Sequence, residues 1–334
     1  MSSRPGFSRA LRCALVVWLF LGLQFVVAQD TPQPQPAPAL SQQPKPILPP
    51  SPQPSPPQTP SAKQERVIPA AAERHFHQAM AFEHDGNAEN AIDEYKAAIK
   101  EYPDYFAAHY NLGRLYLDKR GYSEAIAELK IAVNLRPEDA NAHNNLGLAL
   151  KHNRDLDGAL QQYQEAVRLN PRMASAQNNL ANILYMKRDF NGAIQHYRAA
   201  LALEPKDSDK LSPQARSDLA DTHTNLGSAL DDAGKAEEAI AEYKEAIRLE
   251  PRDPKVHYNL SILYQNRKDA PAAVAELRQA AKLAPDWPTP HIMLARLLKD
   301  SDPKAALDQC VIADGLTQDA KLHDLCQELQ KKAQ

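Results

Sequence analysis

The stretch ANAHNNLGLALKHNRDLDGALQQYQEAVRLNPRM, residues 140–173, has the pattern of two short amphipathic helices followed by a proline. Residues three and four apart lie on the same side of a helix. The first helix (helix A) therefore has an apolar face at Leu146, Gly147 and Leu150. The second (helix B) has an equivalent face, formed by Ala159, Tyr163 and Ala166. Pro171 then prevents helix B from continuing.

This pattern recurs with a period of 34 residues. Closing prolines stand at Pro103, Pro137, Pro171, Pro205, Pro251 and Pro285. The small residue of helix B recurs at Ala91, Ala125, Ala159, Ala193, Ala239 and Ala273. A single helix pair has no partner for its apolar face, so the copies must stack on one another to bury it.

The spacing of the small, large and proline residues resembles the tetratricopeptide repeat (TPR) family. The resemblance covers about three-quarters of the chain. It implies an all-α, right-handed solenoid of about seven helix-turn-helix repeats with a C-terminal capping helix. Because such arrays bind other proteins, the implied function is a scaffold with a protein partner.

The repeats divide the chain into segments. Repeats 1 to 4 run without a gap from Ala72 to Asp207, and repeat 5 follows an insert at residues 206–217. Ser212 and Pro213 are a typical helix start, so we expect a loop at 206–211 and a helix A in repeat 5 that is about two turns longer. The array is expected to occupy residues 71–317, with Gly315 ending its last helix B, and the capping helix residues 318–334.

The N-terminus has the layout of a secretory signal peptide. Three arginines precede an apolar run at residues 13–27, and Val26 and Ala28 are small residues of the kind that signal peptidases accept. We expect a signal peptide at residues 1–28 and an exported protein, periplasmic or secreted. The alternative is a chain anchored in the membrane by residues 13–27, although this run is short for a span of about 20 residues. Residues 29–70 form a proline-rich linker, with thirteen prolines between Pro32 and Pro60.

Composition argues against several classes of function. The formal net charge is −3 and no basic block is present, which is unlike a nucleic-acid-binding protein. The sequence has only 11 glycines and no phosphate loop, zinc-protease motif or nucleophile elbow. No segment is left over for a separate catalytic domain, so we expect neither an enzyme nor a cofactor.

A histidine recurs at the fourth place of helix A, two places before a recurrent asparagine. The histidines are His75, His109, His143, His223, His257 and His291. Successive copies are separated by two packed helices, far more than the ~2 Å ligand distances of a metal site. We therefore expect these histidines to pack between the helices, and we predict no metal site.

The sixth place of helix A is an asparagine in five repeats, namely Asn111, Asn145, Asn179, Asn225 and Asn259. A primary amide both donates and accepts hydrogen bonds, so it can pair with the N–H and C=O of an extended peptide. By resemblance this face lines the concave groove of a TPR solenoid. The predicted peptide-binding residues are this row together with Tyr110, Arg114, Asn182, Tyr258 and Ile262. A plain solvated surface is the alternative interpretation of the row.

Two functions remain open at this stage. The first is a scaffold that holds an extended segment of another protein and helps to assemble an envelope or secreted complex. The second is a structural or self-associating spacer without a peptide ligand.

TPR domains that clamp a terminal carboxylate use Lys and Arg in the groove, and here acids are as frequent as bases, which disfavours that variant. The partner is not identified by the sequence.

Cys310 and Cys326 are the only cysteines that would remain after signal cleavage. They lie on the last helix B and the capping helix, which we expect to be neighbours. An exported protein permits a disulfide between them, and two buried thiols are the alternative.

Overall fold

The computed structural model describes residues 67–333, apart from residues 206–209 and 318. The predicted signal peptide and almost all of the proline-rich linker lie outside the described residues, as does most of the predicted loop at 206–211. The described part of the chain contains helices and turns and no strand. None of its helices is long and apolar enough to cross a membrane.

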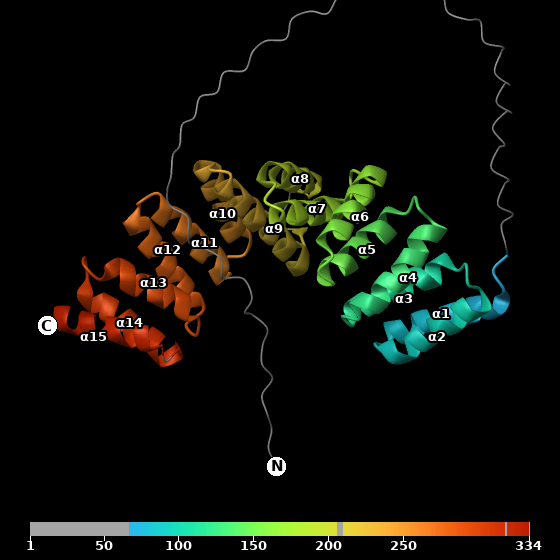
Figure 1. Ribbon diagram of the computed structural model, residues 1–334, viewed down its shortest axis with the longest axis horizontal. Coiled ribbons are helices and arrows are strands. Elements are labelled where there is room, and N and C mark those ends of the chain that lie inside the picture. The colour runs from blue at the N-terminus through green and yellow to red at the C-terminus, as the bar shows by residue number, and fades with distance from the viewer. Residues whose placement is uncertain (1–66, 206–209, 318, 334) are drawn as a thin grey trace, which may run out of the picture. The chain divides into compact units, whose positions relative to one another are not determined.

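The helices alternate between the A and B positions of successive repeats (Figure 1). The A helices are α1 (Ala70–His84), α3 (Phe106–Asp118), α5 (Ala140–His152), α7 (Ala174–Met186), α9 (Pro213–Asp232), α11 (Pro254–Asn266) and α13 (Pro288–Leu298). The B helices are α2 (Ala88–Glu101), α4 (Tyr122–Leu135), α6 (Leu156–Leu169), α8 (Phe190–Leu203), α10 (Ala236–Leu249), α12 (Ala270–Leu283) and α14 (Pro303–Thr317). A last helix, α15 (Ala320–Lys332), packs on α14.

Each helix A packs on the helix B of its own repeat, and each helix B packs on the next helix A. Successive A helices from α3 to α11 also touch each other. Their surfaces therefore form one continuous face, which we call the A-face. The all-α repeat fold expected from the sequence is confirmed.

Close approach of the two helices in a repeat depends on the small residue at the eighth place of helix A. In repeat 3, a Cβ atom on Gly147 would lie 2.8 Å from the ring of Tyr163. Tyr163 itself is completely buried. The pairing of a small residue on helix A with a large one on helix B thus fills the core without a gap.

Side-chain caps explain where many of the helices begin. Ser212 accepts a hydrogen bond from the N–H of Ala215, and Pro213 occupies the first turn of α9. This helix has 20 residues, against 13 in α5 and α7, so the predicted two-turn extension is confirmed. Aspartate caps act in the same way at Asp139, Asp155, Asp189, Asp253, Asp269 and Asp319.

The C-terminal end differs from the sequence prediction in one respect. Gly315 does not end α14, which continues to Thr317. The hydroxyl of Thr317 donates to the carbonyl of Ala313, and the next helix begins only after the cap Asp319. Glycine ends a helix as a C-cap where its backbone adopts a positive φ. Gly315 is not among the residues with a positive φ.

Candidate functional site

The recurrent histidines lie between the two helices of their repeats. His109, His143, His257 and His291 are all less than 9 % exposed, so these four pack inside their repeats as expected, whereas His75 and His223 are half-buried. Each recurrent histidine places Nδ1 within 2.6–2.8 Å of a carboxylate or amide oxygen on helix B. The pairs are His75–Glu94, His109–Glu128, His143–Gln162, His223–Glu242, His257–Glu276 and His291–Gln309.

Repeat 4 contains the same contact with the residues exchanged. Gln177 occupies the place of the histidine on helix A, and its Oε1 lies 2.7 Å from Nδ1 of His196 on helix B. This exchange was not predicted from the sequence, although His196 stands where the other repeats have Glu or Gln. The contact therefore depends on the pair of side chains and tolerates either order.

The same side chains reach the turn that precedes their repeat. Nε2 of His143 lies 3.0 Å from the carbonyl oxygen of Pro137, and Nε2 of Gln177 donates to the carbonyl of Pro171 at 2.9 Å. His109 and His291 make equivalent contacts with Pro103 and Pro285. One side chain thus joins helix A, helix B and the closing proline of the preceding repeat, and this explains the recurrence of the histidine without a ligand.

Three of the five recurrent asparagines bridge neighbouring A helices along the A-face. Nδ2 of Asn145 donates to the hydroxyl of Tyr110 at 3.1 Å, and Nδ2 of Asn179 donates to Oδ1 of Asn144 at 3.0 Å. Nδ2 of Asn225 lies 3.4 Å from Oδ1 of Asn182. These bonds occupy one amide hydrogen of each residue and orient the side chain. The amide oxygen and the second N–H remain for another group.

At the N-terminal end of the A-face the predicted residues are already paired. Arg114 donates to Glu83 on α1, and it also lies 3.6 Å from Asp118. Glu83 accepts a further hydrogen bond from the hydroxyl of Tyr95 at 2.9 Å. Because two carboxylates neutralise Arg114, this guanidinium is not poised to receive an acidic group from a partner.

At the C-terminal end, Tyr258, Asn259 and Ile262 are half-buried on α11. The ring of Tyr258 packs against that of Trp287, with centroids 4.9 Å apart. The Asn259 side chain makes no hydrogen bond with any residue that the structure describes. These residues lie on the part of the A-face that follows α9.

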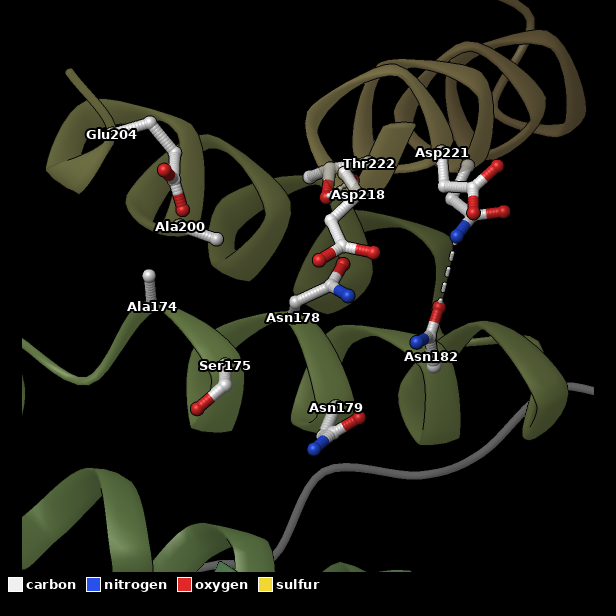
Figure 2. A pocket seen from close by; sticks show the side chains of 11 residues that line it. Ala174, Ser175, Asn178, Asn179, Asn182, Ala200, Glu204, Asp218, Asp221 and Thr222 are labelled. Carbon is white, nitrogen blue, oxygen red and sulfur yellow. Dashed lines mark hydrogen bonds between the residues drawn. The ribbon is translucent and has the colours of Figure 1, made fainter. Parts of the chain in front are cut away.

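A polar pocket of about 350 Å³ opens at the centre of the A-face, between repeats 4 and 5. Figure 2 shows α7 contributing Asn178, Asn179 and Asn182 to its wall, while α9 contributes Asp218 and Asp221. Glu204 closes the side next to α8, and Asn225 bonds to Asn182 across the pocket. The pocket therefore gathers three of the predicted site residues, Asn179, Asn182 and Asn225.

The pocket is acidic. No Lys or Arg lines it, whereas Glu204, Asp218 and Asp221 do. Burial, followed by the nearby charge of Asp253, raises the pKa of the Asp221 carboxyl above its usual value. The Oδ1 atom of Asn178 is buried there without a hydrogen-bond partner among the described residues. A ligand that donates hydrogen bonds or carries positive charge would satisfy these groups.

The acidic wall was missed in the sequence analysis. Asp218 lies in the turns that only α9 has, outside the 34-residue pattern on which the predicted site was based. The insert was the available signal, because a helix lengthened at its start must extend the A-face beyond the other repeats.

The C-terminal cap is held by a disulfide. The structure joins Cys310 of α14 to Cys326 of α15, with Cα atoms 5.5 Å apart, which lies within the usual range of about 4.4–6.8 Å. Both residues are buried, and Leu322 and Leu329 lie in the same apolar cluster. Within the described residues, no group of three His, Cys, Asp or Glu side chains is placed to hold a metal ion.

Sequence profiles described as tetratricopeptide repeat match residues 61–106, 110–171, 152–208, 227–268 and 254–286. Together they cover more than half of the chain. The chain belongs to the tetratricopeptide repeat family. TPR proteins bind protein partners and are generally non-enzymatic scaffolds, so this TPR chain is a protein–protein interaction scaffold.

Solved structures agree on the fold. PilF of Pseudomonas aeruginosa is 21 % identical, with a TM-score of 0.54 over 68 % of this chain and 97 % of its own. The C-terminal part of a TPR repeat-containing protein from Cytophaga hutchinsonii is 15 % identical, with a TM-score of 0.59 over 75 % of this chain and 98 % of its own. Such identities carry the fold alone. No protein with a curated description matches the sequence.

Proposed function

We propose that this TPR scaffold binds an extended segment of another protein along the centre of its A-face. Exported to the periplasm or secreted, it would serve the assembly of an envelope or extracellular complex. The observation that carries the proposal is the row of oriented amides at Asn145, Asn179 and Asn225. Each amide retains a donor and an acceptor for the backbone of a partner.

Oriented amides favour binding for an entropic reason. A free asparagine side chain must be ordered when it meets a ligand, and ordering a side chain opposes binding by about 0.5–1.5 kcal/mol. Here the bond to the preceding helix A has already fixed each amide. The backbone of an extended segment repeats its N–H and C=O groups at regular intervals, which suits a row of such side chains.

The test replaces Asn145, Asn179 and Asn225 with Ala in the full-length chain. Partners are first captured by cross-linking in the native compartment and identified by mass spectrometry, and capture by wild type and variant is then compared. We expect the triple variant to lose the partner while its circular dichroism remains helical. A matched control replaces Lys130, Gln161 and Lys244, which are exposed on α4, α6 and α10, with Ala and should bind normally. Equal capture by the asparagine variant and the wild type would exclude the A-face as the binding site.

A further inference from the structure

A second pocket of about 350 Å³ lies beside the acidic one. Asn182 and Asn225 line both pockets, so the hydrogen-bonded pair of amides forms the boundary between them. On its other side the second pocket is bounded by Lys151, His152 and Met186. The two pockets are therefore neighbours along the A helices of repeats 3 to 5.

Lys151 gives the second pocket a positive charge without a counterion. Its ammonium group makes no hydrogen bond or ion pair with any residue in the described part of the chain, and burial lowers the pKa of this group. No carboxylate lines this pocket. A partly desolvated charge without a partner is unfavourable, so an anionic ligand group at this position would stabilise the site.

The other basic group that lines this pocket is His152. His152 stacks on the ring of Tyr122 at 4.8 Å, and burial, with a contribution from Lys151, lowers the pKa of its imidazole. The hydroxyl of Tyr185 donates to Asp232 at 2.7 Å, which directs that carboxylate to the tyrosine.

The first pocket has the opposite character. Glu204, Asp218 and Asp221 surround it, and the buried Oδ1 atom of Asn178 lacks a donor. The two pockets thus present acceptors on one side of the amide pair and an unpaired cation on the other.

The length that the two pockets span together suits a short stretch of extended chain. On α7, Ser175 lines the acidic pocket and Met186 lines the second one. Eleven residues of helix rise about 16 Å. An extended segment covers this length in about five residues.

We propose that the two pockets act together and select a segment that carries a basic and an acidic side chain within about five residues of each other. The Lys or Arg side chain enters the acidic pocket, and the Asp or Glu side chain pairs with Lys151. Asn182 and Asn225 hold the backbone between the two charges. This inference rests on the proposed function and adds the class of sequence that the A-face recognises.

Opposite charges in adjacent pockets also reject other segments and fix the direction of binding. A segment with two acidic side chains would place one of them against Asp218 and Asp221, and reversing a segment with one charge of each sign would place both charges against like charges. Such juxtapositions are the usual source of specificity in charged interfaces.

The test exposes the full-length protein to a random library of twelve-residue peptides and sequences those that are retained. We expect the wild type to enrich peptides that carry one basic and one acidic residue within about five positions. The Lys151→Gln variant should lose the preference for the acidic residue and keep that for the basic one. The double variant Asp218→Asn, Asp221→Asn should show the reverse. For a peptide enriched by the wild type, each variant should weaken binding about tenfold.

A matched control carries Lys130→Gln and Asp308→Asn, which alter exposed charges on α4 and α14 and should enrich the same peptides as the wild type. Enrichment of peptides without a charge pair, or of the same sequences by wild type and both pocket variants, overturns this inference while the proposed function stands. A failure of any peptide to be enriched counts against the proposed function and this inference together.

Discussion

The histidine and the asparagine lie two residues apart on α3, α5, α9 and α11, yet they face different neighbours. His143 is 6 % exposed, and it contacts Gln162 on helix B and the carbonyl of Pro137. Asn145 is half-buried on the A-face and bonds to Tyr110 of the preceding helix A. Both rows therefore recur with the same period in the sequence, whereas their side chains bond to different partners.

The comparison distinguishes side chains whose hydrogen bonds are satisfied within the fold from side chains that keep unused donors and acceptors. The histidine is surrounded by its own chain, and both ring nitrogens have partners. The asparagine uses only part of its hydrogen-bonding capacity and keeps the rest at the surface. Three predictions test whether this division is correct.

The largest effect is expected for His143→Ala. The substitution removes both contacts of the buried imidazole and leaves a cavity in its place, with the carbonyl of Pro137 and the amide of Gln162 deprived of this partner. We expect the free energy of unfolding to fall by about 2–3 kcal/mol, measured by urea denaturation. His143→Gln is the matched control, because repeat 4 carries Gln177 at this place with the equivalent bond to Pro171. This variant should retain most of the stability. An equal loss of stability in both variants would show that these hydrogen bonds do not stabilise the fold.

A smaller effect is expected in the asparagine row. Asn145→Ala loses one hydrogen bond between A helices and should lower the free energy of unfolding by about 1 kcal/mol. Asn259→Ala loses no bond to the described residues, so its effect should lie within about 0.5 kcal/mol. Urea denaturation of both variants checks the difference. A loss with Asn145→Ala as large as that with His143→Ala would place the asparagine row among the structural residues.

The smallest effect is expected in the pH dependence of stability, through the Gln177–His196 pair of repeat 4. Burial lowers the pKa of His196 below its ordinary value of 6.5, against a smaller opposing influence of Asp189. As the pH falls through 6.5, the unfolded chain therefore takes up the proton before the folded chain does, and stability decreases until folded His196 is also protonated.

His196→Gln removes this contribution while an amide remains opposite Gln177. Between about pH 7.5 and pH 5.5, the variant should consequently lose less stability than the wild type, as measured by thermal unfolding. Gln164→Ala, at an exposed position of α6, is a suitable control and should follow the wild type. A steeper loss in the His196 variant would contradict the direction of the shift.

Much of the fold follows from local patterns. The period of 34 residues, the closing prolines and the start of α9 at Pro213 all depend on contacts within a few turns of helix, so they can be read from neighbouring residues. The burial of the histidine row followed from its position on the same face as Leu146 and Gly147. The predicted end of α14 was wrong because Gly315 is compatible with both a helix and a C-cap. The residues that follow it decide between the two.

The candidate site follows only partly from the sequence. Asn179, Asn182 and Asn225 were expected at the A-face, and they do line the central pocket. Their partners were not expected, because Asn225 and Asn182 are 43 residues apart and meet only through the packing of α9 on α7. Arg114 was expected to be available to a ligand, and its pairing with Glu83 likewise depends on contact between repeats.

The sequence alone determined that paired helices must stack, since each repeat can bury its apolar stripe only against a neighbouring repeat. Only the tertiary structure decided which polar side chains meet. The first pocket is acidic because the extended start of α9 places Asp218 beside Asp221 against α7, while Lys151 approaches the same amides from α5. Charges on α5 and α9 come to lie on either side of one pair of amides through the relative placement of the helices, which no local pattern encodes.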